Sequence, residues 1–257
     1  MAETTIKVEQ GAAWLTITLA RPDKHNAINE RMLEELDDTL MAAAAQPGLR
    51  ALLLRAEGKS FCAGIDLNQA HVLESAAPGQ RNLETVFQRL ERFPLPTLAA
   101  INGTALAGGL ELALHCDLRL AARGARLGMT LARVGIMLPF SFTRKLIEVC
   151  GAPGAARLLF TAEILDSGQA QAMGLVHHVV ADQELEQSAL AWLESVAANA
   201  PLSLRAMKAS LRRAMSGAFQ APHDDIDRLI EQVQHSEDAR EGPRAFLEKR
   251  KPNWQGR

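Results

Sequence analysis

Two short turns of small residues carry the clearest chemical signal in the sequence. The first turn lies in the segment Ser60-Phe61-Cys62-Ala63-Gly64-Ile65-Asp66-Leu67, and the second turn lies in the segment Asn102-Gly103-Thr104-Ala105-Leu106-Ala107-Gly108-Gly109-Leu110-Glu111. Each lies between a predicted strand and a predicted helix, so its backbone N–H groups are free and the positive end of a helix dipole lies behind them. Two such turns that face each other can each donate one N–H to a single carbonyl oxygen and stabilise the charge that forms on it. Glu111 follows within one helical turn and is the candidate acid or base beside this oxyanion hole.

Glycine-rich turns have two other interpretations. Either turn, taken alone, can serve only to let a strand and a helix pack closely. A dinucleotide site is disfavoured, because Gly103-x-Ala105-x-x-Gly108 is a poor match to the GxGxxG pattern. About twenty residues further on, the chain has Arg123 and Arg126 where an acidic residue would bind the ribose.

Other reactive side chains near the turns are interpreted as structural. His115 lies one helical turn beyond Glu111 and can orient or protonate it, but a packed, hydrogen-bonded core histidine is the commoner outcome. Cys62 has no His or Asn partner evident in the sequence, so we interpret it as a small buried thiol. Asp66 is interpreted as a helix cap and Asp117 as a residue that fixes the start of a strand.

Two further segments contain polar side chains. Residues 71–80 are predicted to form a hinge or lid, in which His71 and Glu74 are interpreted as solvated rather than reactive. A basic face on a C-terminal helix is also interpreted as solvated, with contact to phosphate or RNA as the alternative. Its members are Arg205, Lys208, Arg212 and Arg213.

The elements that position the two turns alternate between strands and helices. Residues 13–19 alternate apolar and polar as in a half-buried strand, and the apolar run at 49–54 predicts a strand covered on both faces. Between them, Asn29 is predicted to cap an amphipathic helix. Beyond residue 182 the pattern is helical throughout, and the whole order predicts an α/β fold. Further strands are predicted at 97–102, 117–123 and 175–180, and further helices at 83–90, 141–150 and 154–160.

Composition excludes several classes of function. The chain has 257 residues, 47% of them hydrophobic, so one large domain with a sizeable core is expected. Because 28 Lys and Arg face 30 Asp and Glu, the net charge of −2 gives no basic footprint for nucleic acid or an anionic membrane. We expect no signal peptide, membrane span or metal site, and the three widely spaced cysteines favour a reducing cytoplasm.

Four motifs, in this order and at these intervals, resemble the crotonase (enoyl-CoA hydratase/isomerase) family over essentially the whole chain. They are RPDKHNAIN, SFCAGIDL, PLPTLAAINGTALAGGLELALHCDLRLAA and SEDAREGPRAFLEKRKPNW. The resemblance implies an α/β fold in which a crotonase-like spiral of repeated ββα units precedes a C-terminal helical trimerisation region. Residues 1–181 are therefore interpreted as the spiral core with the CoA and acyl site, and residues 182–257 as the oligomerisation region. The implied assembly is a homotrimer or a hexamer that is a dimer of trimers.

The resemblance also implies roles for particular residues. The oxyanion-hole donors fall on the backbone N–H groups of Ile65 and Gly108, and the first catalytic glutamate falls on Glu111. The implied substrate is an acyl-CoA thioester, with no cofactor beyond its CoA moiety and no nucleic-acid or membrane partner. Positions that contact CoA in the family fall on Lys24, His25, Ala27, Ala63, Ile65, Gly108, Phe246 and Lys249.

The chain departs from the family at the second catalytic glutamate. The matching position is Leu131, which can neither activate water nor relay a proton. The adjoining turn is altered too, so Met137 and Phe140 join Leu131 in an acyl pocket that is bulkier and more apolar than usual. Hydratase or isomerase chemistry ranks first, and a thioester decarboxylase or hydrolase of the same fold ranks second. A catalytically weak CoA-binding protein is the remaining alternative, and Leu131 is its best argument.

Overall fold

The computed structural model describes residues 4–69, 81–137, 139–215 and 224–257. Within the last range, the side chains of residues 226, 227, 230, 246 and 247 lie outside the description. The predicted lid at 71–80, with His71 and Glu74, therefore lies outside the described residues, and so does the side chain of Phe246.

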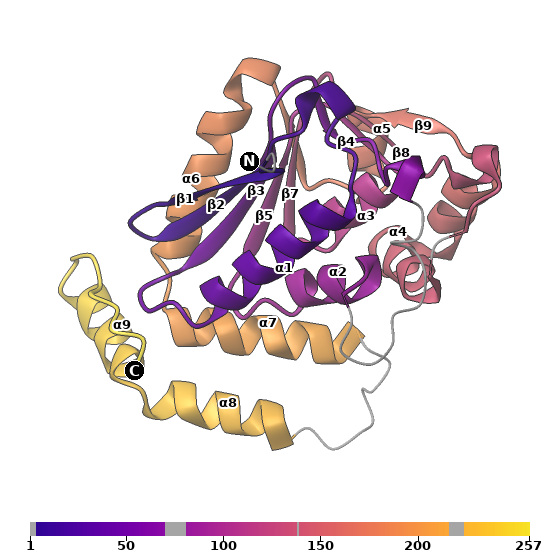
Figure 1. The fold of residues 1–257 in the computed structure, drawn as a ribbon. Helices are drawn as coiled ribbons and strands as arrows, with labels where there is room; N and C mark the ends of the chain where they lie inside the picture. The colour runs from indigo at the N-terminus through magenta and orange to yellow at the C-terminus, as the bar shows by residue number, and fades with distance from the viewer. Residues whose placement is uncertain (1–3, 70–80, 138, 216–223) are drawn as a thin grey trace.

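Two sheets form the centre of the molecule (Figure 1). In the larger sheet, β1 and β2 form an antiparallel pair, and the strands that follow pair in parallel. Its strands, in spatial order, are β1 (Ile6–Gln10), β2 (Trp14–Leu19), β3 (Ala51–Ala56), β5 (Thr97–Ile101), β7 (Leu118–Ala122) and β10 (His178–Val180). The smaller sheet contains, in spatial order, β4 (Ser60–Cys62), β6 (Thr104–Leu106), β8 (Arg126–Gly128) and β9 (Ile164–Asp166).

The order of elements produces a spiral of ββα units. The strands β3 and β4 precede helix α2, β5 and β6 precede α3, and β7 and β8 precede α4. The first strand of each unit joins the larger sheet, and the second joins the smaller sheet, in parallel in both cases. The predicted α/β spiral of ββα units is confirmed, whereas trimerisation stays a prediction.

Helices α1 and α2 begin at capping asparagines, and helix α4 is interrupted at a glycine. The side chain of Asn29 accepts a hydrogen bond from Met32 N (2.9 Å), as predicted, and Asn82 and Thr85 form a reciprocal capping box at α2. Gly151, with φ of 68° and ψ of 166°, interrupts α4, which accounts for the two separate helices predicted there. The helices are α1 (Glu30–Ala44), α2 (Leu83–Glu91), α3 (Gly108–Leu114), α4 (Phe140–Thr161), α5 (Ser167–Ala172), α6 (Leu185–Ala197), α7 (Pro201–Met215), α8 (Asp224–His235) and α9 (Glu237–Leu247). None of the described helices is long and apolar enough to cross a membrane.

The strand β2 is more deeply buried than its alternating sequence predicts. Its Thr16 and Thr18 side chains belong to residues that are 8% and 5% exposed. Arg55 donates a hydrogen bond to Thr18 (3.0 Å), and α6 packs its apolar residues into a second core on the same face of the sheet. The interpretation as a half-buried strand is therefore wrong, because α6 packs on this face of the sheet against β3, β5 and β7, and Arg55 of the neighbouring strand β3 bonds to Thr18.

A buried ion pair ties α7 to the spiral. Lys208 is only 8% exposed, and its Nζ donates to the backbone oxygen of Leu95 (2.9 Å) and to Asp117 Oδ2 (2.6 Å). The same carboxylate accepts hydrogen bonds from the backbone N and the hydroxyl of Thr97 at the start of β5. The structural interpretation of Asp117 is confirmed, and the interpretation of Lys208 as part of a solvated face is wrong.

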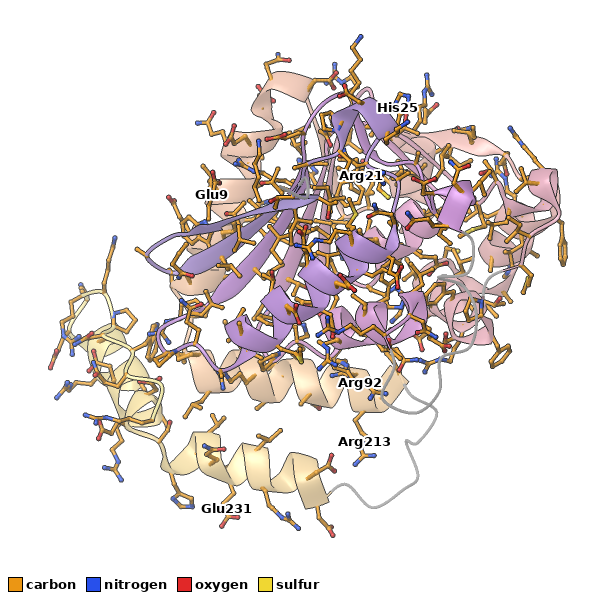
Figure 2. The ribbon with its side chains drawn as sticks, viewed as in Figure 1. Glu9, Arg21, His25, Arg92, Arg213 and Glu231 are labelled. Atoms are coloured by element: carbon orange, nitrogen blue, oxygen red, sulfur yellow. The ribbon has the colours of Figure 1, made fainter. Side chains whose placement is uncertain are left out.

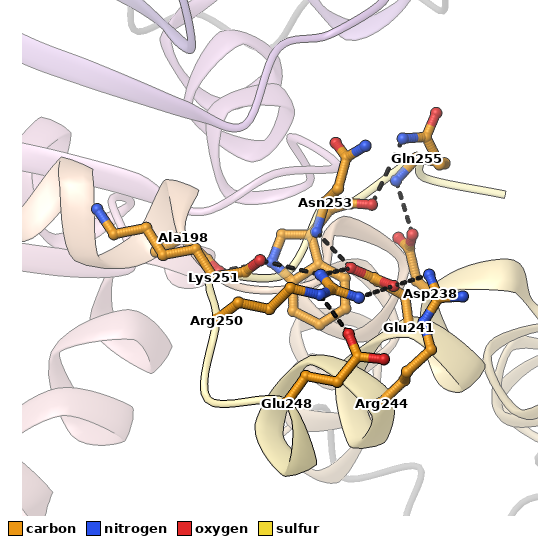
Figure 3. A network of polar contacts seen from close by, with 10 residues as sticks. Ala198, Asp238, Glu241, Arg244, Glu248, Arg250, Lys251, Asn253 and Gln255 are labelled. Atoms are coloured by element: carbon orange, nitrogen blue, oxygen red, sulfur yellow. Dashed lines mark hydrogen bonds and ion pairs between the residues drawn. The ribbon is translucent and has the colours of Figure 1, made fainter.

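The last two helices extend away from the spiral, and the chain then folds back along α9 (Figure 1). Glu241 accepts hydrogen bonds from Arg244, Arg250 and the backbone of Asn253 (Figure 3). Asp238 accepts two hydrogen bonds from the backbone of the tail, one from Gln255 N and one from Gly256 N. Trp254 donates its indole N–H to the backbone oxygen of Ala198 (2.5 Å), which links this tail to the end of α6.

Replacing Lys208 by Met should lower the free energy of unfolding by about 3 kcal/mol, because it leaves the partly buried Asp117 carboxylate without the cation bonded to it. Urea unfolding followed by circular dichroism measures the change. Arg205→Met, on the same helix but without this pair, is the control and should change the free energy by less than about 1 kcal/mol. Equal effects of the two substitutions would contradict a role for the ion pair in attaching α7.

Candidate functional site

The two small-residue turns lie against each other. They follow β4 and β6, which are parallel neighbours in the smaller sheet, so both turns emerge at the same edge. A Cβ atom built on Gly64 would lie 3.4 Å from Gly108 N, and one built on Gly108 would lie 3.7 Å from Ile65 N. A Cβ on Gly109 would lie 2.0 Å from the backbone oxygen of Cys62, so this approach requires glycine.

The contact leaves two backbone donors without acceptors. Within the described parts of the chain, the N–H groups of Ile65 and Gly108 make no hydrogen bond, although their neighbours do. Gly108 begins α3, so its N–H has no intrahelical partner. Ala107 precedes it with φ of 49° and ψ of −119°, a conformation that is strained for a residue with a side chain. Strain of this kind is typical of functional sites, and here it orients the start of α3.

The loop before α1 braces the first turn. Ala63 N donates to the backbone oxygen of His25 (3.0 Å), and the buried amide of Asn26 donates to the backbone oxygens of Glu57, before β4, and of Ser60, the first residue of β4. Arg21 bonds to the carboxylate of Asp66 (3.3 Å), just past the turn. The structure therefore brings the predicted CoA-contacting positions Lys24, His25, Ala27 and Ala63 together beside Ile65; Figure 2 shows Arg21 and His25 in this part of the molecule.

Asp66 has a more specific role than the helix cap predicted for it. Its side chain accepts a hydrogen bond from Asn68 N (3.3 Å), which caps a single 3-10 turn at residues 67–69 rather than a longer helix. Burial alone would raise the pKa of Asp66, but hydrogen bonds from Asn68 and the Arg21 guanidinium outweigh it and the pKa is lowered. The carboxylate thus stays charged and holds the loop to the turn.

Glu111 occupies an unusual environment for a carboxyl group. The residue is 0% exposed, and neither of its carboxyl oxygens has a hydrogen-bond partner among the described residues. Burial raises its pKa well above the ordinary value, and the positive charge of Lys145 opposes this only in part. A buried polar group left unpaired in a folded protein costs free energy, so such a group in a native site points to a ligand or a reaction.

His115 is confirmed as a packed core residue. Its ring lies 5.4 Å from that of Phe87 and 5.2 Å from that of Phe142, and its Nδ1 donates to the backbone oxygen of Glu111 (2.7 Å). Burial lowers the pKa of His115 to about 4, so the ring is neutral at physiological pH. The same Nδ1 lies 3.9 Å from Glu111 Oε2, which places the imidazole directly behind the carboxyl group.

Cys62 is confirmed as a buried thiol rather than a nucleophile. It is 0% exposed, and burial raises its pKa to about 12. Among the described residues, no group of His, Cys, Asp and Glu side chains is arranged to hold a metal ion.

The remaining predicted positions are not all brought to this site by one chain. Leu131 lies nearby, because the carbonyl of Gly128 accepts a hydrogen bond from Ala107 N (2.9 Å) and Leu131 follows three residues later, 9% exposed. Met137 and Phe140 are 66% and 80% exposed, so the chain alone does not enclose them.

Lys249 follows α9, which Figure 1 shows at the end of the C-terminal extension, away from α3. The backbone of Phe246 lies within α9 itself. Their predicted contact with CoA stays a prediction.

Some residues that shape the site carried no clear signal in the sequence. Arg21 and Asn26 fall inside the motif RPDKHNAIN, so their bracing role could have been sought there. Lys145 lies in a helix whose pattern gives no hint that its charge acts on Glu111.

The site has the groups needed to stabilise negative charge on a thioester carbonyl oxygen and to move a proton. The two unbonded N–H donors, of Ile65 and Gly108, belong to turns that are in contact. Glu111, a carboxyl group with a raised pKa, lies in the first turn of α3, the helix that Gly108 begins. Such a pair can stabilise an enolate while a proton is moved to or from carbon.

Comparisons with known proteins agree with this geometry. The family model described as Enoyl-CoA hydratase/isomerase matches residues 9–257. The 2,3-dehydroadipyl-CoA hydratase of Escherichia coli (strain K12) is 34% identical over 257 residues, with 100% of both chains covered. The short-chain-enoyl-CoA hydratase of Clostridium acetobutylicum is 30% identical over 254 residues, which cover 98% of this chain and 97% of the relative.

Solved structures show the same fold. The crystal structure of enoyl-CoA hydratase from Mycobacterium tuberculosis H37Rv superposes with a TM-score of 0.89 at 31% identity and covers 99% of this chain and 100% of that one. Enoyl-CoA hydratase from Bacillus anthracis gives a TM-score of 0.85 at 32% identity, with 98% and 100% covered. The chain therefore belongs to the enoyl-CoA hydratase/isomerase family of the crotonase superfamily and is an acyl-CoA-processing enzyme of that type.

Proposed function

We propose that the chain moves a proton along the acyl group of an enoyl-CoA thioester, with Glu111 as its only acid and base, and shifts the double bond between the 3- and 2-positions. The observation that carries the proposal is the Glu111 carboxyl group, which is buried near two N–H donors; among the described residues, neither the carboxyl group nor the two donors have a hydrogen-bond partner. A carboxyl group with a raised pKa is a stronger base when ionised, as removal of a proton from carbon requires.

The reaction proceeds through a dienolate. The Glu111 carboxylate takes a proton from the α-carbon of a 3-enoyl thioester, and the electron pair of that C–H bond moves toward the thioester carbonyl. The N–H groups of Ile65 and Gly108 donate to the carbonyl oxygen and hold the developing negative charge. Protonated Glu111 then returns the proton to the γ-carbon, and the double bond is left between the α- and β-carbons.

Leu131 favours isomerisation over addition of water. Hydration is easiest when two carboxylates hold one water molecule between them, and the chain supplies a buried apolar side chain at the second position. An isomerase needs no bound water, so a dry wall beside the acyl group does not impair it.

Hydration is the second candidate, and the names of the relatives favour it. Both the Escherichia coli and the Clostridium acetobutylicum relatives are named hydratases. In this alternative, Glu111 alone takes a proton from water, which attacks the β-carbon, and then delivers that proton to the α-carbon. The enolate and its two N–H donors are common to both reactions.

Substrate binding and assembly complete the proposal. The CoA moiety binds along Lys24, His25, Ala27 and Ala63, and no cofactor beyond it is required. Self-association is supported by an apolar groove of about 560 Å³ between α7 and α8, where Met207 is 66% exposed. The free state of the three cysteines supports a cytoplasmic location.

Incubation of the purified protein with 3-enoyl-CoA and 2-enoyl-CoA in deuterated water should yield the shifted isomer, and mass analysis locates any deuterium at the α- or γ-carbon. Glu111→Gln should lower the turnover by about a hundredfold or more while leaving CoA binding nearly unchanged, because only the acid–base group is lost. Glu186→Gln, at an exposed position on α6, is the control.

Each product pattern decides between mechanisms. Addition of water in place of isomerisation would establish the hydratase alternative. Release of free CoA would instead establish a thioester hydrolase. Full turnover by Glu111→Gln would contradict the role of this carboxyl group in any of these reactions.

The raised pKa of Glu111 should also make the stability depend on pH. Its folded pKa lies above the unfolded value of about 4.5, so between the two the native state holds a proton that the unfolded state has lost. The free energy of unfolding therefore falls as pH rises above 4.5, by up to about 1.4 kcal/mol per pH unit from this group. Urea unfolding from pH 4.5 to 8 should show Glu111→Gln gaining stability relative to the unsubstituted protein as pH rises. A difference that stays flat with pH would refute the raised pKa.

Alanine substitutions at the two neighbouring glycines of the second turn should affect different properties, which are the turnover for Gly108 and the stability for Gly109. At Gly108 the new Cβ meets its nearest atom at 3.4 Å but lies in the oxyanion hole, so turnover should fall about a hundredfold with little loss of stability. At Gly109 the Cβ overlaps the backbone of Cys62, so the free energy of unfolding should fall by about 2 kcal/mol or more. Thermal unfolding and steady-state kinetics separate the two effects, and full activity of Gly108→Ala would place the thioester oxygen elsewhere.

A further inference from the structure

A charged cavity of about 260 Å³ lies at the end of α3 opposite the oxyanion hole. It lies where the C-terminal ends of α2 and α3 approach α4 and α7, and Figure 2 shows one of its residues, Arg92, next to α7 and far from Arg21 and His25. His115 forms part of its wall. The cavity is therefore separate from the proposed CoA-binding loop and adjoins the catalytic carboxyl group only through one imidazole ring.

The charges that line this cavity do not balance. Five cationic side chains face three carboxylates, an excess of two positive charges. All three carboxylates are already engaged: Glu91 and Glu148 with Lys145 at 2.6 and 2.7 Å, and Asp117 with Lys208 at 2.6 Å, a residue that does not line the cavity. The five cations are Arg92, Arg119, Arg144, Lys145 and Arg212.

Two of the guanidinium groups form no direct ion pair with the carboxylates near them, which are Asp117 for Arg119 and Glu91 and Asp117 for Arg212. Arg119 is only 6% exposed, and its hydrogen bonds go to the backbone oxygens of Leu175 (2.7 Å) and Cys116 (2.6 Å). Arg212 is half-buried, and its Nε has no hydrogen-bond partner among the described residues. Neither forms an ion pair with a carboxylate in the described parts of the chain, and burial lowers the pKa of both.

Arginine cannot relieve this cost by losing its proton. A guanidinium stays charged inside proteins, and the nearby carboxylates Glu91 and Asp117 are bonded directly to Lys145 and Lys208, so they balance the charges of the two arginines only in part. Its planar array of donors is matched best by the oxygens of phosphate or carboxylate groups. We propose that this cavity is a binding site for a small multivalent oxyanion of the phosphate class, held by Arg119 and Arg212 with Arg92 at its rim.

Occupancy of the site should act on the catalytic group. Burial and the positive charges of Lys145 and Arg144 lower the pKa of His115. An anion bound beside these two cations would offset their charge and raise that pKa. Because His115 Nδ1 lies 3.9 Å from Glu111 Oε2, a bound anion changes the electrostatic potential at the carboxyl group. The cavity thus links an anion to the activity without contact with the acyl group.

Inorganic phosphate is the probe. Titration calorimetry and thermal unfolding of the whole protein are measured in potassium phosphate and in potassium chloride of equal ionic strength. Phosphate, but not chloride, should raise the melting temperature at millimolar concentration. Arg212→Gln should weaken phosphate binding at least about tenfold, as expected for loss of charge-assisted hydrogen bonds, and Arg92→Gln should weaken it less.

Two controls locate the site. Arg205→Gln, on the same helix but outside the cavity, should leave phosphate binding unchanged. Lys24→Gln should leave it unchanged too, and loss of binding in this variant instead of Arg212→Gln would assign the phosphate to the CoA-binding loop and overturn the proposal.

Other results would also overturn it. Equal effects of phosphate and chloride would show only screening. A change in the molar mass of Arg212→Gln by light scattering, with no phosphate binding by the unsubstituted protein, would assign the cavity to an acidic group of a second copy of the chain.

Discussion

Direct contact between two backbone turns is the constraint on which this site depends. Gly109 must lack a side chain because the carbonyl of Cys62 occupies that space, and this approach sets the separation of the Ile65 and Gly108 N–H groups. The short parallel strands β4 and β6 place the two turns at one edge of the smaller sheet. Hydrogen bonds from Asn26 to the backbone of residues 57 and 60 fix the chain that leads into the first turn. The two donors are backbone N–H groups, so a substitution that changes only a side chain does not remove them.

Burial gives Glu111 its chemistry. A carboxyl group surrounded by core residues, with a neutral His115 behind it, is neither solvated nor paired. In water the same carboxyl group would have a lower pKa and would be a weaker base, so burial gives Glu111 the raised pKa on which the proposed proton transfer depends. Leu131, which is 9% exposed, adds an apolar side chain to this part of the chain, and the proposed isomerisation needs no second carboxylate at that position.

Sequence patterns predicted the parts of this structure that depend on local signals. The cap at Asn29, the helix α2, the break near Gly151 and the fully buried strand β3 all follow from residue types and spacing. The three-residue strands of the smaller sheet were not predictable, because three residues are too few to show a period. Burial of Lys208 and the charge of Lys145 beside Glu111 depend on contacts between distant segments, which periodicity does not encode. The hole donors were predicted as positions, but only the fold shows that they face each other.

The fold-back of the C-terminal tail along α9 has a consequence for how the molecule opens. Hydrogen bonds from the backbone of the tail to Asp238 and Glu241 fix the tail against α9. The unit formed by α8, α9 and the tail is connected to the spiral by the bond from Trp254 to the end of α6 and by contacts between α8 and α7. A segment with many internal bonds and few to the body unfolds as a cooperative unit of its own, with a lower free energy than global unfolding. Amide hydrogens in α8 and α9 therefore exchange through a local opening that association of chains would suppress, whereas those of the central strands report the stability of the whole spiral.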